Sequence, residues 1–317
     1  MDLVADIGAT NARFQYCDSG MLVDAPLVLK TTRFDAASDL LCAAMAELGP
    51  ADIDSALLAI AGPVNDEQTS REIQVTNTGL RFSDQYCAAV LGCSTYLAND
   101  FYALAHGVPY FSSLVQIGGD DVVKGTKALL GPGSGLGMAT LVPDRDGHWQ
   151  VLASEGGHAD LAPGSHLEAE LWGLLMTDLG HVSWESVLCG AGLQQLYTTM
   201  CTLWGASPEA LSPQQISARG MTMADPVCHQ TLETFCGLLG AAAGNLALTV
   251  AAVGGVYIGG GIVPQMLEFV QSSPLRRRFE ERGALSGYVE AIPLFVITED
   301  NPGLQGAAHC LNNIYPN

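Results

Sequence analysis

Apolar strands and helices alternate along the first hundred residues. The predicted strands cover residues 2–7, 12–17, 23–31, 55–61 and 94–98, and the predicted helices cover residues 34–48, 83–91 and 101–106. The run SALLAIA at 55–61 is continuously apolar after Ser55, which is typical of a parallel strand buried on both faces. A hairpin at the start, followed by alternating helices and strands, predicts an α/β domain.

The order of a strand, a glycine-rich turn and a second strand occurs again over residues 128–142. Ser134 lies in this second turn, and Thr10 lies in the first. This weak internal duplication predicts two similar domains that face a cleft. The remaining predicted elements are a mostly helical stretch over 166–250, strands at 255–258 and 294–297, a helix from Pro264, and a last helix from Asn301 nearly to the C-terminus.

Length and charge exclude several classes of protein. The chain has 317 residues, which suits two domains, and its 48% hydrophobic and 15% charged residues indicate a core-rich globular protein. Acidic residues outnumber basic ones 33 to 13, so the formal net charge is −20. Such a charge disfavours binding to nucleic acid or to an anionic membrane surface. An anionic substrate must therefore be held by local dipoles, because the net field repels it.

We expect a cytoplasmic protein. The start, MDLVADIGAT, lacks the basic region of a signal peptide. The most apolar window, 237–258, predicts a buried helix followed by a strand, and a membrane span is the alternative. The nine cysteines show no C-x-x-C spacing, which argues against a zinc ribbon or a disulfide framework and favours buried thiols in a reducing compartment.

The first turn, Gly8-Ala9-Thr10-Asn11, follows Asp6 at the end of a predicted strand. Backbone N–H groups of a turn of small residues can approach phosphate oxygens, and the Thr10 hydroxyl can add a donor. Asp6 can hold a hydrated Mg²⁺, because this ion keeps waters and takes few carboxylates. An ordinary hairpin turn is the alternative interpretation.

Two further glycine clusters follow predicted strands. The turn over 131–137 has four glycines around Ser134, but it matches neither G-x-G-x-x-G nor a Walker A loop. The cluster Gly259–Gly261 lets a planar ring lie against the backbone. A phosphate-holding turn and a ring-binding turn are the functional interpretations, and ordinary tight turns are the alternatives.

Five polar residues stand out in the loops. Asn99 and Asp100 follow a strand, where they can cap a helix or offer a carboxylate that accepts a proton from a substrate hydroxyl. Glu155 and His158 have the E-x-x-H spacing of some metal ligands, but the glycines between them favour a loop that presents both groups to a polyol. Structural hydrogen bonding is the alternative for this pair. Glu185 alone predicts only a capping or surface acid.

Taken together, six segments resemble the bacterial glucokinase family, within the superfamily of sugar kinases, actin and heat-shock chaperones. They are LVADIGATNARF, LANDFYALAHGVP, GPGSGLGMA, EGGHADLAP, HVSWESVLCGAGL and YIGGGIVPQ, and they span nearly the whole chain in the family's order. The resemblance implies ATP-dependent phosphorylation of D-glucose to glucose 6-phosphate, with ATP and Mg²⁺ as cofactors, and a homodimer.

The resemblance also implies the fold and the domain boundaries. We expect two actin-like ATPase (ribonuclease H-like) domains that flank a cleft, the second enlarged by helices. The small α/β domain would cover residues 1–105 and be completed by the C-terminal helix, 301–317. The large α+β domain would cover residues 106–300.

The same resemblance assigns a role to each candidate residue. Asp100 would be the general base, and it would bind the sugar together with Asn99, Glu155, His158 and Glu185. The two turns would hold the phosphates, Gly259–Gly261 would border the adenosine, and Asp6 would hold Mg²⁺ through water. The cofactor-binding set is Asp6, Gly8, Ala9, Thr10, Asn11, Gly133, Ser134, Gly135, Gly259, Gly260 and Gly261.

Departures from the family pattern keep alternatives open. Ala9 replaces the usual second glycine of D-x-G-G-T-N, and if that position needs a positive φ it costs about 1 kcal/mol. Ser134 replaces a threonine and keeps the hydroxyl, and a tryptophan expected after residues 76–79 is missing. The cysteine-rich zinc motif of ROK-type glucokinases is absent, so we expect no structural zinc. The alternative functions are a kinase for another hexose or an amino sugar, and a non-catalytic glucose sensor.

Overall fold

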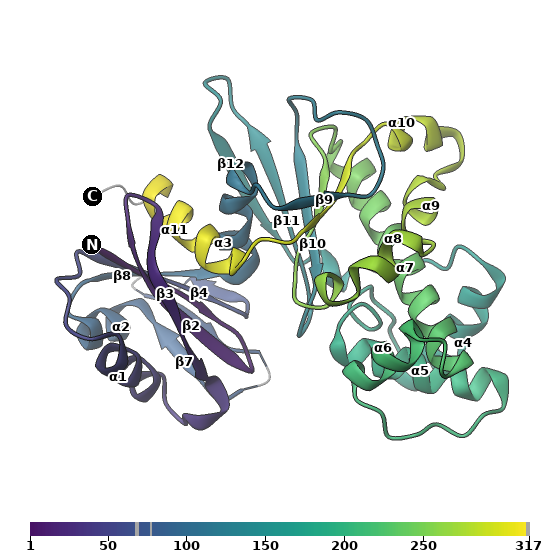
Figure 1. The fold of residues 1–317 in the computed structure, drawn as a ribbon, viewed down its shortest axis with the longest axis horizontal. Coiled ribbons are helices and arrows are strands. Elements are labelled where there is room, and N and C mark those ends of the chain that lie inside the picture. Colours follow the sequence, from purple (N-terminus) through teal and green to yellow (C-terminus); the bar gives the residue numbers. More distant parts are fainter. Residues whose placement is uncertain (67–69, 77, 315–317) are drawn as a thin grey trace. The chain divides into compact units, whose positions relative to one another are not determined.

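The computed structural model describes residues 1–66, 70–76 and 78–314 (Figure 1). The chain forms two compact units, Met1–Ser112 with Glu299–Asn317 and Ser113–Thr298. Both units contain helices around a mixed sheet, so the predicted α/β class is confirmed. Asn77, in the segment where the family's tryptophan is missing, and residues 315–317, at the end of the expected C-terminal helix, lie outside the described residues.

The first unit contains a five-stranded sheet of order β3-β2-β1-β4-β8, with β2 and β3 antiparallel to their neighbours and β4 and β8 parallel to β1. A small antiparallel sheet, β5-β6-β7, accompanies it. The elements are β1 Asp2–Ile7, β2 Asn11–Asp18, β3 Met21–Lys30, the 3₁₀ helix Thr31–Arg33, α1 Ala37–Leu48, β4 Ser55–Ile60, β5 Val64–Asp66, β6 Arg71–Gln74, β7 Arg81–Ser83, α2 Asp84–Leu91, β8 Ser94–Asn99, α3 Asp100–Gly107, the 3₁₀ helix Val108–Tyr110 and α11 Pro302–Ile314.

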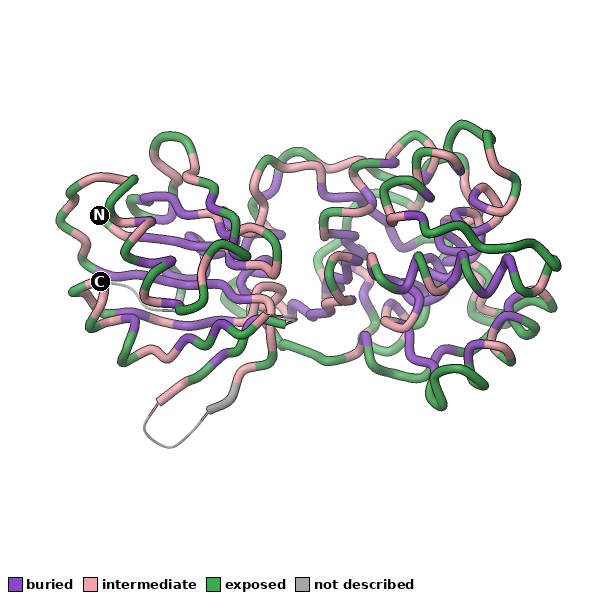
Figure 2. The backbone as a smooth tube through the Cα atoms, turned by 90° about the horizontal axis from the view of Figure 1, so that it is seen from below, coloured by how far each residue is buried: buried purple, intermediate pink, exposed green. Residues whose placement is uncertain are grey.

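Side-chain alternation explains why β4 is apolar at every position after Ser55. Leu58 and Ile60 pack in one core cluster with residues of α1 and α2, whereas Leu57 and Ala59 pack in another with residues of α3 and α11. Every residue of β4 is buried, as the central strands in Figure 2 show. The strand is therefore covered on both faces, as the continuous run predicts.

The second unit contains a six-stranded sheet of order β12-β11-β10-β13-β14-β9. Its core combines this sheet with the long helix α7 and the helices around it. The elements are β9 Leu114–Gln116, β10 Lys127–Pro132, β11 Leu136–Pro143, β12 Trp149–Ser154, the 3₁₀ helix Gly156–His158, α4 His166–Leu179, α5 Gly190–Trp204, α6 Pro213–Met221, α7 Pro226–Val250, β13 Val256–Ile258, the 3₁₀ helix Val263–Met266, α8 Leu267–Ser272, α9 Leu275–Glu280, the 3₁₀ helix Gly283–Leu285, α10 Ser286–Glu290 and β14 Leu294–Ile297.

The two large sheets repeat one topology. The order β3-β2-β1-β4-β8 matches the order β12-β11-β10-β13-β14, and each has one antiparallel meander followed by two parallel strands. Strand β9 adds a sixth, antiparallel member to the second sheet. In both sheets a small-residue turn joins the central strand to its antiparallel neighbour, so the two turns occupy equivalent places.

Helix α7 is the buried helix that the apolar window predicts. It is long and apolar enough to cross a membrane, but 67% of its most apolar 18-residue window is buried inside the second unit. Gly240 explains how closely it packs, because a Cβ there would lie 2.1 Å from the Leu275 carbonyl oxygen of α9. The apolarity of α7 is accounted for by the core of this unit.

Some predicted boundaries differ from the structure. The helix expected from Pro264 is a 3₁₀ helix over Val263–Met266 followed by α8. Strand β12 and the sheet β5-β6-β7 are not among the predicted elements. Strands β6, β7 and β12 are short and each has one buried residue, so their apolar alternation is weak.

Lys127 of β10 is a buried cation on this apolar sheet. Its Nζ donates to the Tyr257 hydroxyl and to the Gly254 carbonyl oxygen, and lies 5.6 Å from the centre of the Trp149 ring. Burial lowers the pKa of this ammonium from 10.5 to about 8. Below pH 8 the Lys127 side chain is therefore charged inside the folded protein, whereas in the unfolded chain the same charge would be solvated by water.

We expect Lys127→Met to raise the free energy of unfolding at pH 7 by roughly 1–3 kcal/mol. In the natural protein, stability should rise between pH 8 and 10.5, because the unfolded chain then holds a proton that the folded chain has released. Lys127→Met should remove this rise. Urea unfolding at pH 7 and pH 9 measures the effect, with the exposed Lys124→Met as the matched control. Identical pH dependence in the two variants would contradict the expectation.

Candidate active site

The first turn is a closed hairpin turn tied to the end of β3. The Gly8 N–H donates to the Asn11 carbonyl oxygen at 3.0 Å, and the Thr31 hydroxyl donates to the Gly8 carbonyl oxygen at 2.9 Å. Within the described residues, the N–H groups of Ala9 and Thr10 have no hydrogen-bond partner. Ala9 does not adopt a positive φ, so the strain that its replacement of glycine suggested is not present. The turn can present backbone donors to an anion.

Asp6 is the next-to-last residue of β1, just before this turn, and lies opposite Arg13 on β2. The distance between Asp6 Oδ2 and Arg13 Nη1 is 3.8 Å. Burial raises the pKa of Asp6, and the Arg13 guanidinium opposes that rise. The start of α11 also approaches this carboxylate, because a Cβ on Gly303 would lie 2.7 Å from Asp6 Oδ2. The C-terminal helix therefore contributes to the first candidate site.

We expect Gly303→Ala to raise the KM for ATP by a factor of about 3–10, because the new methyl group must displace the Asp6 carboxylate. Gly287→Ala is the matched control: Gly287 is also the second residue of a helix, and a Cβ there meets nothing within 4 Å. Steady-state kinetics with varied ATP measures the difference. An equal KM in both variants would show that the approach of α11 to Asp6 has no role in nucleotide binding.

Asn99 and Asp100 join β8 to α3. Asn99 is the N-cap: its Oδ1 accepts from the N–H groups of Phe101 and Tyr102 at 3.0 and 3.1 Å, and its Nδ2 donates to the Gly62 carbonyl oxygen at 3.1 Å. Asp100 Oδ1 accepts from the Phe101 N–H at 2.9 Å. The predicted capping interpretation is thus confirmed for Asn99, and it fixes the start of α3, which carries the Asp100 carboxylate.

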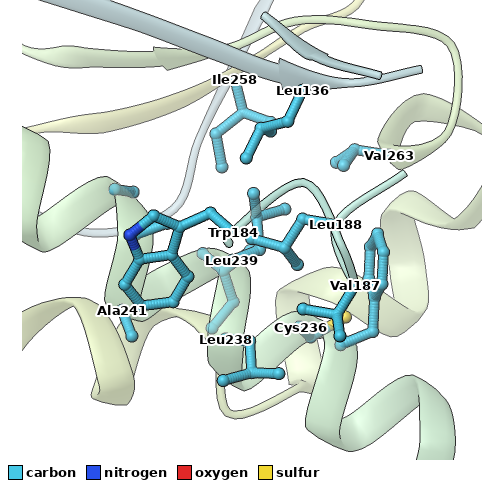
Figure 3. Close-up of a cluster of buried hydrophobic side chains, with 14 of the residues drawn as sticks. Leu136, Trp184, Val187, Leu188, Cys236, Leu238, Leu239, Ala241, Ile258 and Val263 are labelled. Carbon is cyan, nitrogen blue, oxygen red and sulfur yellow. The ribbon is translucent and has the colours of Figure 1, made fainter. Parts of the chain in front are cut away.

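Core packing orients Glu185 in the second unit. Trp184, Val187 and Leu188 are all buried in the main core cluster together with Leu136, and Figure 3 shows their side chains converging. Glu185 lies in the turn between them and keeps 31% of its side chain exposed. Anchoring on both sides therefore fixes the backbone of the turn that carries the carboxylate, while the hydroxyls of Ser183 and Ser186 are hydrogen-bonded within the turn.

Glu185 lies close to His158 and to the glycine turn. The Leu136 N–H donates to Glu185 Oε2 at 2.7 Å, and Glu185 Oε1 lies 3.7 Å from His158 Nε2. Glu155 is exposed at the start of the same short 3₁₀ helix, where its carbonyl oxygen accepts from the His158 N–H. Residues 155–158 therefore form the loop that their glycines predict. Among the described residues, no group of three or more His, Cys, Asp or Glu side chains is placed to hold a metal.

The second glycine turn is the three-residue connection between β10 and β11. The Gly133 N–H donates to the Gly135 carbonyl oxygen at 2.8 Å, and the Gly190 N–H at the start of α5 donates to the Gly133 carbonyl oxygen at 3.0 Å. Ser134 is exposed at its tip. Both turns are thus three-residue hairpin connections that contain one hydroxyl, with Thr10 as the third residue of the first and Ser134 as the second residue of the other.

Gly260 of the third cluster must be glycine. Its φ is +79°, and a Cβ would lie 2.4 Å from the Pro132 carbonyl oxygen. The Gly259 N–H donates to the Leu130 carbonyl oxygen at 2.8 Å, so β13 stays beside β10 up to this point. The third cluster is therefore held against the end of the strand that leads into the second turn.

A pocket of about 380 Å³ in the second unit brings the second and third glycine clusters together. Its wall is mainly apolar and backbone, with a few amide and hydroxyl side chains, a composition suited to a planar ring with polar edges. The lining residues are Gly133, Ser134, Gly190, Leu193, Pro213, Gln214, Ser217, Met221, Gly261, Ile262, Gln265 and Met266. Of the predicted cofactor-binding set, Gly133, Ser134 and Gly261 line it.

Comparison with known proteins decides the family. A model of the family described as "Glucokinase" matches residues 3–314. The chain belongs to the glucokinase family. This confirms the family and the enzyme class that the six segments predict.

Two proteins illustrate the similarity over the full length. The chain is 42% identical to a glucokinase of Chromobacterium violaceum over 319 aligned residues, which cover 99% of this chain and 90% of the relative. It is also similar to the crystal structure of a glucokinase from an Antarctic psychrotroph, with 35% identity, a TM-score of 0.83 and coverage of 98% of each chain.

A more distant structure shares the fold alone. The ROK family glucokinase of Streptomyces griseus, solved in complex with glucose and AMPPNP, has 20% identity, a TM-score of 0.66 and coverage of 98% of each chain. The fold is thus kept at 20% sequence identity.

Sequence reasoning missed several residues of this glucokinase's candidate sites. Gly303 approaches Asp6 from the far end of the chain, and Gly190 binds the second turn from the start of α5. Gln214, Ser217 and the methionines of the pocket wall are also absent from the predicted set. Gly303 and Gly190 could have been found from the sequence, because each lies at the start of a predicted or observed helix, where a glycine lets another segment approach the backbone closely.

Proposed function

We propose that this chain transfers the γ-phosphoryl group of ATP to the 6-hydroxyl of D-glucose. The observation that carries the proposal is the glucokinase match over residues 3–314, because that range contains all the candidate site residues. The glucose and AMPPNP bound by the Streptomyces griseus relative support the same pair of substrates.

In this proposal the sugar is recognised by Asn99, Asp100, Glu155, His158 and Glu185. Carboxylates accept hydrogen bonds from sugar hydroxyls, whereas an amide and an imidazole can donate to them. Asp100 is the general base that takes the proton from the 6-hydroxyl as the oxygen attacks phosphorus. Such a site rejects analogues that lack the recognised hydroxyls, because their partners would be left unpaired.

The nucleotide is proposed to bind through backbone donors. The 380 Å³ pocket takes the adenosine, with Gly261 at its edge and Gly259 and Gly260 shaping the backbone that leads to it. The turns at Gly8–Asn11 and Gly133–Gly135 hold the phosphates through N–H groups and the hydroxyls of Thr10 and Ser134. Local dipoles of this kind are needed because the chain carries a formal net charge of −20.

Asp6 is proposed to hold Mg²⁺ through water. A single carboxylate at the end of a strand, beside a turn with unused N–H groups, fits a hydrated Mg²⁺ next to phosphate oxygens. The ion would neutralise charge on the phosphates when it is bound. Arg13, 3.8 Å from Asp6, is placed to keep the carboxylate ionised.

The rest of the proposal follows the family. We propose that the two units are actin-like domains that close on the sugar and exclude water, that the enzyme acts in the cytoplasm, and that it is a homodimer. The repeated sheet topology supports the actin-like interpretation. Ala9 had favoured a glucose sensor, but its ordinary backbone conformation removes that support.

A panel of sugars tests the function. ADP release is followed by a coupled assay with ATP and Mg²⁺ for glucose, mannose, fructose, galactose and N-acetylated amino sugars. We expect the highest kcat/KM for glucose. A higher kcat/KM for another sugar would identify that sugar as the substrate. Binding of glucose in calorimetry without any ADP release would identify the protein as a glucose sensor.

A further inference from the structure

The two carboxylate oxygens of Glu185 face two different segments of the second unit. Oε2 accepts the Leu136 N–H at 2.7 Å, directly after the second glycine turn, whereas Oε1 lies 3.7 Å from His158 Nε2. Gly135 is in contact with the same carboxylate, because a Cβ there would lie 2.4 Å from Oε2. One side chain thus touches both the proposed phosphate turn and the proposed sugar loop.

Backbone contacts close this arrangement into a ring. The Glu185 N–H donates to the Gly157 carbonyl oxygen at 2.8 Å, and a Cβ on Gly157 would lie only 2.2 Å from the Leu136 carbonyl oxygen. Buried Trp184 fixes the turn that carries Glu185. The phosphate turn, the sugar loop and the Glu185 turn are therefore in direct mutual contact, with little room to move independently.

We propose that Glu185 is a positioning residue for the phosphate turn as well as a sugar ligand, and that it couples the affinities for glucose and nucleotide. This inference rests on the proposed function. A sugar hydroxyl bound at Oε1 restrains the carboxylate, and the restrained Oε2 then holds the Leu136 N–H and the turn before it in place for phosphate. Because the coupling is reciprocal, a change at the turn must also alter sugar affinity.

A matched pair of glycine variants tests the effect of the turn on the sugar. In Gly135→Ala the new methyl group must push the Glu185 carboxylate aside, whereas a Cβ on Gly173 of α4, in the same unit, meets nothing within 4 Å. Glucose binding is measured by calorimetry without nucleotide, and thermal unfolding verifies that both variants fold. We expect Gly135→Ala to weaken glucose binding about tenfold and Gly173→Ala to leave it within about twofold. Equal glucose affinities in the two variants would overturn the coupling.

A second pair tests the effect of the sugar ligand on the nucleotide. Glu185→Ala removes the acceptor of the Leu136 N–H, and the control Glu170→Ala removes an exposed carboxylate from α4 of the same unit. With AMPPNP as the probe and no sugar present, we expect about fivefold weaker binding in Glu185→Ala and an unchanged affinity in Glu170→Ala. Unchanged AMPPNP affinity in Glu185→Ala would overturn the inference.

The experiments distinguish a failure of the proposed function from a failure of the proposed coupling. If the natural protein binds no glucose, the proposed function fails and the coupling fails with it. If the natural protein binds and phosphorylates glucose, but the two glycine variants have equal glucose affinities, only the coupling is overturned.

Discussion

Replacing Asp100 by asparagine is expected to lower kcat for glucose phosphorylation by about 10²–10⁴-fold while glucose binding stays measurable. An asparagine has the size of the aspartate and can still accept the Phe101 N–H, which Asp100 Oδ1 accepts at 2.9 Å. It cannot take a proton from the sugar hydroxyl. Loss of the acid from the first turn of α3 should cost no more than about 1 kcal/mol of stability.

Asp84 offers a closely matched control for this variant. It is the first residue of α2 in the same unit, and its Oδ1 accepts the N–H of the following residue, Gln85, at 2.7 Å. Asp84→Asn should therefore share any effect of lost charge at a helix start and keep the natural kcat. Calorimetry with glucose and a coupled kinase assay separate binding from turnover. Similar kcat values for the two variants would exclude Asp100 as the base.

Asp6→Asn is expected to lower the apparent affinity for Mg²⁺ by about 10–100-fold and to reduce kcat at a fixed Mg²⁺ concentration. Asparagine keeps the shape of the side chain beside Gly303, but it lacks the charge that would orient the water molecules of a hydrated Mg²⁺. Because burial raises the pKa of Asp6, activity of the natural enzyme should begin to fall at a higher pH than an exposed aspartate would give. This fall in activity at low pH, the acidic limb of the pH profile, should be absent from the residual activity of Asp6→Asn.

Titration of activity with Mg²⁺ between pH 5 and 8 checks both expectations for Asp6. Asp2→Asn is the control, since Asp2 lies at the other end of β1 and accepts the Ser55 hydroxyl at 2.7 Å. It should keep the natural Mg²⁺ requirement and the acidic limb. If Asp6→Asn behaves in the same way, Asp6 has no part in binding the metal.

Local sequence patterns predicted most of the fold because each pattern has a single physical solution. The run at 55–61 has apolar side chains on both faces of the strand that it predicts. Such a strand must be covered on both faces, and β4 is. The turn at Gly8–Asn11 joins β1 to β2 and forms the predicted hairpin. The short strands β6 and β7 carried no comparable signal, since each contributes one buried residue to the core, Ile73 and Phe82.

The sequence named candidate site residues one by one but did not predict their arrangement. Glu185 alone resembled a capping acid, and only the positions of Leu136 and His158 show which groups it contacts. The proposed nucleotide pocket combines glycine clusters more than a hundred residues apart with amides and methionines that form no motif. Gly303 is near Asp6 only because α11 packs against α3 and the sheet. Such contacts depend on tertiary packing, which sequence spacing does not encode.

The most direct test of the central claim is the identity and yield of the product. Purified protein is incubated with ATP, Mg²⁺ and D-glucose, and glucose 6-phosphate and ADP are quantified in the same sample. We expect the two products in equal amounts, and about 10²–10⁴-fold slower formation of both by the Asp100→Asn variant. ADP without glucose 6-phosphate, or glucose phosphorylated at another hydroxyl, would contradict the claim.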